Sequence, residues 1–157
     1  MHRDTISKVL ELQQDGEIAL GYHDILCGEH IATGAYRTVY DCAIGKDLVV
    51  KIEYDISGFE NVTEYRIWDL VAGTEYEKWF APVVRIADNG RILLQKKVKP
   101  LPENYELPKR LPAFLTDIKH ANFGLYKGHL VACDYSFTLY RLGDMGLNNK
   151  TRKADWY

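Results

Sequence analysis

The sequence predicts an α+β fold, in which short antiparallel strands form a sheet and helices pack beside it. Three observations support this fold class. Runs rich in β-branched and aromatic residues, separated by glycine-containing turns, fill residues 17–54. Apolar residues recur at helical spacing over residues 59–73. Two later segments, residues 79–98 and 122–134, each contain two apolar runs with a turn signal between them.

Composition and charge limit the kind of protein that this chain can be. It has 157 residues, 46% of them apolar, which is enough to build the core of one globular domain. The formal net charge of -2 gives no overall basic field of the kind that drives binding to duplex nucleic acid. The first residues lack the apolar core of a signal peptide, and no run approaches the roughly 18 apolar residues of a membrane span. We therefore expect a cytoplasmic protein that binds neither nucleic acid nor membrane.

The cysteines indicate a reduced chain. Cys27, Cys42 and Cys133 show no C-x-x-C spacing, so we expect free thiols. His23 and His30 flank Cys27, and the three side chains could hold a metal. A fourth ligand is missing, so we expect instead a strand or loop with unrelated polar residues.

The first third of the chain is expected to form a short helix and then an antiparallel meander. Residues 4–15 carry an apolar stripe with a capping residue before it and Gly16 after its end, which indicates an amphipathic helix. Three β-prone runs follow at residues 23–34, 36–45 and 47–54. Short turns between them favour antiparallel neighbours.

The next expected helix carries a carboxylate on its apolar face. Glu64 shares one helical face with three apolar residues, Ile67, Trp68 and Val71. An inward carboxylate is costly unless it is paired, and the nearest cation is Lys51, which follows the apolar run "DLVV". We expect an ion pair between Lys51 and Glu64. The alternative is that Glu64 lies at the edge of the stripe and reaches water.

Two hairpins complete the expected strands. Residues 79–98 place Asp88-Asn89-Gly90 at a turn, and residues 122–134 turn through Tyr126-Lys127-Gly128. Four of the five prolines lie between these hairpins, and they forbid a long helix there and favour extended backbone. They are Pro100, Pro102, Pro108 and Pro112.

A second inward carboxylate ends the last expected strand. Asp134 directly follows the apolar run of residues 130–133, and an acid at the end of a buried strand needs a cation, a metal or hydrogen-bond donors. Upstream, the stretch "DIKHAN" brings Asp117, Lys119 and Asn122 close together in the sequence.

The order of these features resembles the protein kinase-like family over residues 31–136. The shared features are a glycine turn between two strands, a lysine on the third strand, an inward glutamate on the next helix, the pattern D-x-K-x-x-N and a strand-terminal aspartate. The resemblance implies a kinase-like N-lobe, with an antiparallel five-stranded sheet and one inward helix, and a drastically reduced C-lobe that carries the catalytic loop and a β-hairpin. One minimal domain would then consist of an N-terminal helix (1–16), an N-lobe (17–94), a hinge (95–98), a reduced C-lobe (99–136) and a tail (137–157).

The resemblance implies an ATP-binding site in the first part of the chain. The loop "IATGAYRTVY", which contains Gly34, would cover the phosphates, and Lys51 would grip them while paired to Glu64. Gln95, in the hinge, would lie alongside the adenine.

It also implies catalytic and metal-binding residues in the second part. Asp117 would be the base that accepts the proton of the substrate hydroxyl, and Lys119 would neutralise the transferring phosphoryl group. Asn122 and Asp134 would bind Mg²⁺, with Asp134 as the principal ligand. These residue types suit phosphoryl transfer, because that reaction needs oxygen ligands for Mg²⁺ and cations for phosphate oxygens.

The sequence also departs from the family pattern. Ala32 and Arg37 stand where the loop usually has glycines, so the backbone is expected to approach phosphates less closely. Leu115 and Thr116 replace the His-Arg pair before the catalytic aspartate, which argues against control by a phosphorylated activation loop. Neither the link before Asp117 nor the tail is long enough for the helices that normally buttress this loop and bind substrate.

Two functions are open from the sequence. The first is a minimal ATP- and Mg²⁺-dependent phosphotransferase of unknown acceptor, because the polar residues of the pattern occur together. The second is a pseudokinase-like module that binds a nucleotide or a partner and modulates a host protein, because the helical lobe is missing. Such a compact chain suggests a phage or another virus, and hence the host cytoplasm.

A protein partner or a homodimer is also expected. Apolar residues around the expected catalytic loop must be covered by something, and a second copy or a host protein could do so. These residues are Phe114, Leu115, Phe123 and Leu125. The alternative is that the tail folds back over them with its own apolar side chains, which are Phe137, Leu139, Tyr140, Leu142, Trp156 and Tyr157.

Overall fold

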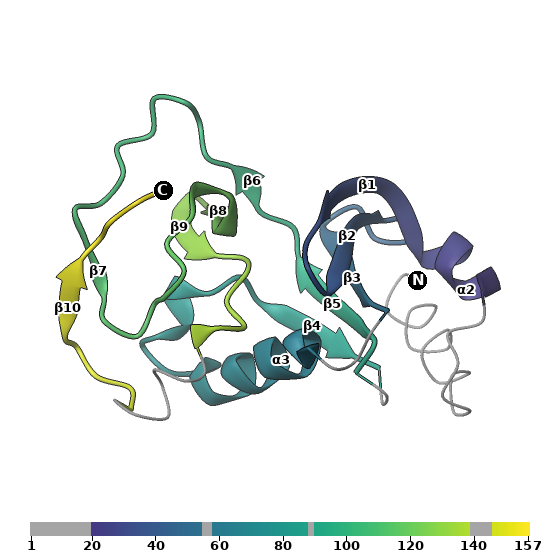
Figure 1. Cartoon of the computed structure of the whole chain (residues 1–157), viewed down its shortest axis with the longest axis horizontal. Helices are drawn as coiled ribbons and strands as arrows, with labels where there is room; N and C mark the ends of the chain where they lie inside the picture. The colour runs from purple at the N-terminus through teal and green to yellow at the C-terminus, as the bar shows by residue number, and fades with distance from the viewer. Residues whose placement is uncertain (1–19, 55–57, 88–89, 139–145) are drawn as a thin grey trace. The chain divides into compact units, whose positions relative to one another are not determined.

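The computed structural model describes most of the chain and shows two compact units (Figure 1). The described residues are 20–54, 58–87, 90–138 and 146–157. Unit 1 comprises the described residues up to Tyr65 together with Val83–Lys97, and unit 2 comprises Arg66–Pro82 and the described residues from Val98 onward. The helix expected over residues 4–15 lies outside the described residues.

Unit 1 contains a five-stranded antiparallel sheet, which confirms the predicted α+β class and the predicted sheet. Its strands are β1 (Cys27–Thr33), β2 (Arg37–Cys42), β3 (Leu48–Glu53), β4 (Val83–Ile86) and β5 (Ile92–Lys96). They lie in the order β1-β2-β3-β5-β4. The meander β1-β2-β3 and the hairpin β4-β5 are therefore confirmed. Asp88 and Asn89, in the turn of that hairpin, lie outside the described residues.

The predicted start of the meander is wrong. The sequence predicts a strand from residue 23, whereas the structure has helix α2 (Leu20–Leu26) directly before β1. In a strand, Ile25 and Leu26 would point to opposite faces of the sheet. In the helix, Leu26 is fully buried, Ile25 is 47% exposed, and the Leu26 carbonyl accepts a hydrogen bond from Ala43 N–H at 2.8 Å. The helix thus puts one apolar side chain in the core and leaves its neighbour in solvent.

Strand β3 separates an apolar face of the sheet from a polar one. All of its side chains are buried. One face carries the apolar cluster of unit 1, formed by Leu26, Cys42, Leu48, Val50, Ile52, Ala87, Ile92 and Leu94. Because side chains alternate along a strand, Lys51 and Glu53 point to the other face. There they contact the first two turns of helix α3 (Glu60–Val71).

Unit 2 contains two small antiparallel sheets. The first has the order β6 (Lys99–Pro100), β8 (Phe123–Tyr126), β9 (His129–Ala132), and the second pairs β7 (Arg110–Pro112) with β10 (Thr151–Lys153). Two single turns of 3₁₀ helix, Glu77–Trp79 and His120–Asn122, also belong to this unit. The proline-containing segment between β6 and β7 has no helix, as its sequence predicts.

The predicted hairpin β8-β9 is confirmed. Tyr126 pairs with His129, so the loop consists of Lys127 and Gly128, and their φ angles are 50° and 82°. Two positive φ angles are typical of a type I′ turn, which favours glycine because glycine has no Cβ. Strand β9 ends at Ala132, one residue before the expected end.

Aromatic rings form the core of unit 2. Phe80 is 1% exposed, stacks on Phe114 with 5.9 Å between ring centroids, and meets Tyr135 edge-on at 5.0 Å. Phe114, Leu115 and Phe123 are buried within the chain, and Leu125 is half-buried. The expected protein partner or second copy stays a prediction.

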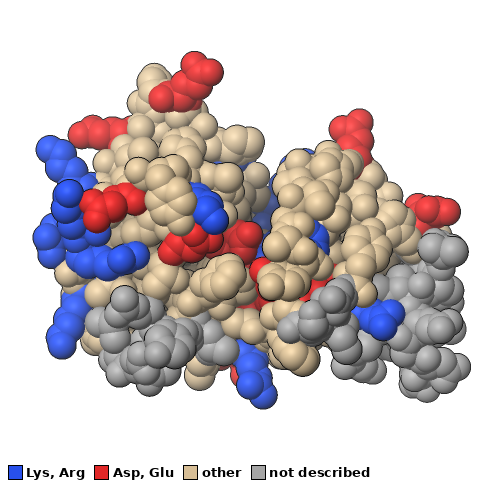
Figure 2. Space-filling model, in the orientation of Figure 1, with Lys and Arg blue, Asp and Glu red and all other residues tan. Residues whose placement is uncertain are grey.

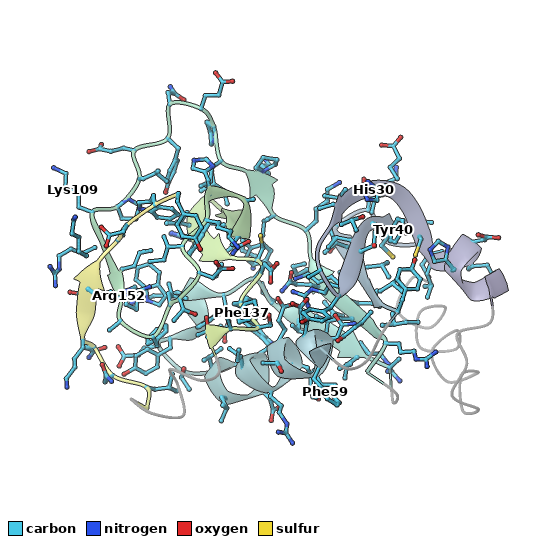
Figure 3. All side chains as sticks on the ribbon, viewed as in Figure 1. His30, Tyr40, Phe59, Lys109, Phe137 and Arg152 are labelled. Carbon is cyan, nitrogen blue, oxygen red and sulfur yellow. The ribbon has the colours of Figure 1, made fainter. Side chains whose placement is uncertain are left out.

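Part of the tail contributes to this cover. Trp156 packs edge-on against Phe123 with 4.9 Å between ring centroids. Phe137 does not contribute in this way, because it is 61% exposed (Figure 3). Leu139, Tyr140 and Leu142, also expected to help, lie outside the described residues.

Basic side chains gather on the ribbon of β7 and β10 (Figure 2). Arg110 lies directly opposite Lys153, and like charges in such positions weaken a strand pair. Hydrogen bonds compensate: Arg110 donates to Thr151 Oγ1 and O, both at 3.0 Å. Arg152 donates to the Leu115 carbonyl at 2.7 Å. The Arg110 bonds hold the two strands together, and the Arg152 bond anchors the ribbon to the loop that precedes β8.

The unit boundaries can be compared with the expected lobes. The chain passes from unit 1 to unit 2 between Lys97 and Val98, within the expected hinge of residues 95–98. The expected N-lobe of residues 17–94 differs from unit 1, because Arg66–Pro82 clusters with unit 2. Helix α3 therefore contributes its first half to unit 1 and its second half to unit 2.

The helices of the described residues are short. Helix α2 has 7 residues and α3 has 12. No helix in this part of the chain is long and apolar enough to span a membrane.

Candidate functional site

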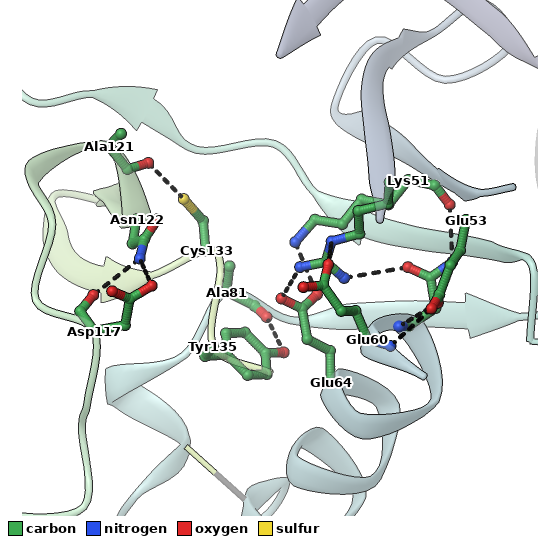
Figure 4. A network of polar contacts seen from close by, with 12 residues as sticks. Lys51, Glu53, Glu60, Glu64, Ala81, Asp117, Ala121, Asn122, Cys133 and Tyr135 are labelled. Carbon is green, nitrogen blue, oxygen red and sulfur yellow. Dashed lines mark hydrogen bonds and ion pairs between the residues drawn. The ribbon is translucent and has the colours of Figure 1, made fainter. Parts of the chain in front are cut away.

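The candidate site residues fall into two groups, one in each unit. Figure 4 labels Lys51 and Glu64 from the first group, and Asp117 and Asn122 from the second. Unit 1 holds Gly34, Lys51, Glu64 and Gln95, and the structure brings Lys51 and Glu64 into contact. Unit 2 holds Asp117, Lys119, Asn122 and Asp134, and the first three of these contact one another.

The predicted ion pair between Lys51 and Glu64 is confirmed. Lys51 lies on the polar face of β3, and Glu64 lies in the second turn of α3. Lys51 Nζ is 2.8 Å from Glu64 Oε2, and the exposed fractions of the two side chains are 4% and 0%. The alternative, in which Glu64 reaches water at the edge of the helix, is wrong.

Arg37 is a second cation on Glu64, and the sequence analysis did not identify it. The resemblance to the kinase-like family expects a glycine at this position, but Arg37 occupies it and its side chain is buried. Its Nη2 atom is 2.6 Å from Glu64 Oε1, its Nε is 3.0 Å from Glu60 Oε2, and its Nη1 donates to Asn61 Oδ1 at 3.2 Å. A sequence signal did exist, because a buried carboxylate has two oxygens to satisfy and Lys51 reaches only one of them.

Glu53 fixes the start of helix α3 to the sheet. Its carboxylate accepts hydrogen bonds from the backbone N–H groups of Glu60 at 3.0 Å and Asn61 at 2.9 Å. These N–H groups have no partner within the helix, so Glu53 acts as an N-cap supplied by a strand. Asn61 Nδ2 also donates to the carbonyls of Lys51 and Arg91, at 3.2 and 3.0 Å. The position of Glu64 relative to Lys51 is therefore set by several bonds.

The buried network has nearly balanced charge. Glu53 faces the positive end of the α3 dipole, while Arg37 and Lys51 share Glu64. Burial alone would raise the pKa of Glu64, but the two cations outweigh this effect and lower the pKa to about 2. Glu64 is therefore ionised at neutral pH although it is fully buried.

Gly34 and Gln95, the other two residues expected to bind the nucleotide, lie in a turn and in a strand of unit 1. Gly34 lies in the exposed turn between β1 and β2, where its N–H donates to the Arg37 carbonyl at 2.8 Å. An added Cβ would meet only that carbonyl oxygen, at 3.6 Å, so the turn itself does not require glycine. Gln95 is 1% exposed in β5, paired with Val49 and Val83. The adenine contact expected for Gln95 stays a prediction.

In unit 2, the pattern D-x-K-x-x-N folds into a closed loop. Asn122 Nδ2 donates to both the carbonyl oxygen and Oδ2 of Asp117, each at 2.9 Å. Lys119 Nζ is 3.1 Å from Asp117 Oδ1. Asp117 has φ of 50°, a left-handed conformation that aspartate and asparagine tolerate better than most residues. The expected proximity of the three residues is confirmed.

Asp134 is joined to this loop through the backbone. The Asn122 carbonyl accepts hydrogen bonds from Cys133 N–H at 2.8 Å and Asp134 N–H at 3.3 Å. The end of β9 therefore lies against the turn that carries Asn122. Because Asn122 Nδ2 is bound to Asp117, its Oδ1 is the amide atom that could bind a cation beside Asp134.

A magnesium ion here would need ligands besides protein carboxylates. Among the described residues, no three His, Cys, Asp or Glu side chains form a group that could hold a metal. Mg²⁺ is commonly held by one or two carboxylates, water and substrate phosphates. Asn122 and Asp134 suit that mode of binding.

Hydrogen bonds set the charge state of Asp117. Burial would raise its pKa, but bonds from Tyr157, Lys119 and Asn122 outweigh burial and lower it. The pKa of Lys119 is raised, first by its hydrogen bond to Asp117. At neutral pH the loop thus holds an ionised carboxylate next to a protonated amine.

Tyr157 is a further residue at this loop. Its hydroxyl donates to Asp117 Oδ1 at 2.5 Å. The sequence suggests Trp156 and Tyr157 among the tail side chains that could cover the apolar residues around the loop. It does not indicate the polar contact of Tyr157 with Asp117.

His23, Cys27 and His30 do not form a metal site in the structure. The His23 ring lies 3.1 Å from the Tyr54 hydroxyl through Nε2, and His30 Nε2 lies 2.8 Å from Thr33 Oγ1. The rings of His23 and His30 both meet the Tyr40 ring edge-on, at 5.1 and 5.8 Å. Figure 3 labels His30 and Tyr40. The two histidines therefore lie in an aromatic cluster with Tyr40 and Tyr54 on unit 1.

No protein-family model matches this sequence, and no curated protein matches it.

Proposed function

We propose that this chain is a minimal kinase-like phosphotransferase, which moves the γ-phosphoryl group of ATP to an acceptor hydroxyl in the presence of Mg²⁺. The observation that carries the proposal is the closed loop of Asp117, Lys119 and Asn122, with Asp134 bonded to its backbone. The loop and the end of β9 together bring a base, a cation and two oxygen ligands to one part of unit 2, as phosphoryl transfer requires.

Each residue has a role in this proposal. Lys51 binds phosphate oxygens, and the Glu64 carboxylate orients its amine at 2.8 Å. Asp117 accepts the proton of the acceptor hydroxyl, and Lys119 neutralises charge that develops on the transferring group. Asn122 Oδ1 and Asp134 hold Mg²⁺, which when bound would neutralise the phosphate oxygens.

Arg37 adds a feature to the lysine-glutamate pair. While Lys51 binds a phosphate and stays paired to Glu64, Arg37 binds the other carboxylate oxygen at 2.6 Å. The buried carboxylate is then never left without a cation, which would cost several kcal/mol. The pair can therefore engage a ligand without loss of the fold.

One observation favours the second candidate, a pseudokinase-like module that binds a nucleotide or partner. Arg37 occupies a glycine position of the loop and its side chain is turned inward. A loop with Gly34 alone has less freedom to bring backbone N–H groups to phosphates. Such a module would bind without transfer.

The test is incubation with γ-labelled ATP and Mg²⁺, with both ADP formation and label on protein measured. We expect transfer by the wild type and its loss in Asp134→Ala. Asp69→Ala is a matched control, because Asp69 is an exposed aspartate of the same unit and lies on helix α3, far in the sequence from the loop and the tail. Equal ADP formation by wild type and Asp134→Ala would contradict the proposal.

A further inference from the structure

The hydroxyl group nearest to the proposed base belongs to the chain itself. Tyr157 Oη donates a hydrogen bond of 2.5 Å to Asp117 Oδ1. A general base must lie within hydrogen-bond reach of the proton that it removes, and this contact meets that condition. We propose that Tyr157 is a phosphoryl acceptor, so that the enzyme phosphorylates its own tyrosine in cis. This inference rests on the proposed phosphotransferase function.

The contact does not depend on the hydroxyl alone, because the backbone of Tyr157 is docked on the catalytic loop. Its N–H donates to the Ile118 carbonyl at 3.3 Å, and its backbone oxygen accepts from His120 N–H at 3.1 Å. These two bonds bracket Lys119, and the Lys119 amine lies 5.7 Å from the centroid of the Tyr157 ring. The two backbone bonds hold the Cα of Tyr157 in place and so limit where its phenol can point.

The preceding residues hold the same segment in place. The Trp156 indole N–H donates to the Pro108 carbonyl at 2.9 Å, and its ring packs on Phe123. Strand β10 pairs with β7 just before it. The docked segment, residues 151–157, is thus held by a side-chain hydrogen bond, by ring packing and by strand pairing. None of these contacts involves the tyrosine hydroxyl.

A tyrosine that accepts a phosphoryl group must be exposed to solvent, unlike a tyrosine in the core. Tyr157 is 70% exposed, whereas Tyr135, whose hydroxyl donates to the Ala81 carbonyl, is 2% exposed. A buried phenol cannot meet a phosphate donor. The Tyr157 ring has one polar contact at its hydroxyl and otherwise faces solvent over most of its surface.

The step is a phosphoryl transfer from a nucleoside triphosphate. Asp117 Oδ1 takes the phenol proton, and the phenolate oxygen forms a bond to the γ-phosphorus. The bond from the γ-phosphorus to the oxygen that bridges it to the β-phosphorus breaks, and its electron pair leaves with the nucleoside diphosphate. The products are phosphotyrosine at residue 157 and the diphosphate, and the proton on Asp117 passes to solvent.

The experiment uses the full chain with Mg²⁺ and γ-labelled ATP, followed by peptide mass spectrometry to locate phosphate. Three variants accompany the wild type. Tyr157→Phe removes the acceptor oxygen, and Asp117→Asn removes the base. Tyr126→Phe is a matched control, because Tyr126 also has a lysine, Lys127, near its ring at 5.4 Å but lies on the β8-β9 hairpin. Binding of Mg²⁺-ATP is measured by calorimetry on all four proteins.

We expect phosphate on Tyr157 in the wild type and in Tyr126→Phe, and none on Tyr157→Phe. Asp117→Asn should reduce the rate by about 10² or more. The fraction labelled per unit time should not change with protein concentration, since the acceptor is in the same molecule. A rate that rises with concentration would overturn the assignment in cis.

Other outcomes separate this inference from the proposed function. ADP formation, or label on other residues, without phosphate on Tyr157 overturns the inference and leaves the phosphotransferase. Faster ADP formation in Tyr157→Phe, with no phosphotyrosine in the wild type, overturns it as well and makes Tyr157 an inhibitory contact. Absence of Mg²⁺-ATP binding in the wild type overturns both proposals.

Discussion

At the scale of single residues, Glu64 is the centre of the buried ion-pair network of unit 1. Its two oxygens bind different cations, Arg37 at 2.6 Å and Lys51 at 2.8 Å. A carboxylate with one cation would lose its only partner if that lysine were replaced. Because of the second cation, replacement of Lys51 should lower the free energy of unfolding less than replacement of Glu64.

The first prediction compares Glu64→Gln with Lys51→Met. Glu64→Gln leaves two buried cations without their shared carboxylate, so we expect a loss of about 3 to 5 kcal/mol in the free energy of unfolding. Lys51→Met should cost less, because Arg37 still neutralises Glu64. Urea unfolding of both single variants and the double variant measures this, with a coupling energy above about 0.5 kcal/mol expected. Additive effects would show that the 2.8 Å contact has no energetic role.

At the scale of elements, helix α3 depends on a cap from the neighbouring strand. Helix ends need partners for their first N–H groups, and the residues before α3 do not provide one in the contacts described. Glu53 does so instead, through both carboxylate oxygens at 3.0 and 2.9 Å. The cap thus couples the position of α3 to β3, which also carries Lys51.

The second prediction is that Glu53→Ala destabilises the protein by about 2 kcal/mol, the upper end of the range for loss of a helix cap. Because the cap positions Glu64, the same change should also weaken Mg²⁺-ATP binding, although Glu53 has no role in ligand contact. Thermal unfolding and calorimetric titration measure the two effects. Glu77→Ala is a control, since Glu77 accepts only the exposed Gly73 N–H at 2.7 Å. An unchanged unfolding temperature in Glu53→Ala would contradict the capping role.

At the scale of the whole molecule, pH tests the buried network. The pKa of Glu64 is about 2 in the folded protein, against an ordinary value of 4.5. A lowered folded-state pKa gives stability that is present above pH 4.5 and is lost as pH falls toward 2. This interval corresponds to about 3 kcal/mol.

The third prediction follows from this sign. The stability difference between wild type and Glu64→Gln should shrink by about 3 kcal/mol as pH falls from about 5 to about 2, because protonated Glu64 resembles glutamine. Asp117, whose pKa is also lowered, acts equally in both proteins and cancels. Urea unfolding across this pH range provides the measurement. Parallel pH profiles would mean that Glu64 is not ionised in the folded protein.

Local sequence patterns predict much of the fold. Most features that they do not predict depend on contacts between residues far apart in the sequence. Helical spacing placed Glu64 inward, and turn residues located the β4-β5 and β8-β9 hairpins, because these features depend on neighbours in the sequence. The docking of Tyr157 on Asp117 joins residues 40 apart and leaves no local signal. The sequence identifies Arg37 only as a residue in place of a loop glycine. That position does not indicate the direction in which its long side chain points. Helix α2 was missed because a short apolar run fits either a strand or a helix.

The comparison of Asp117→Asn with Asp134→Asn tests the central claim of phosphoryl transfer most directly. Asparagine tolerates the φ of 50° at residue 117, so the first variant should fold normally. Both variants and the wild type are measured for Mg²⁺-ATP binding by thermal shift and for label transfer. We predict that Asp117→Asn keeps the ligand-induced stabilisation, about 2.7 kcal/mol at 100 times the dissociation constant, while transfer falls by about 10² or more. Asp134→Asn should lose both together. Equal label transfer by Asp117→Asn and the wild type would contradict the phosphotransferase account and leave a binding module.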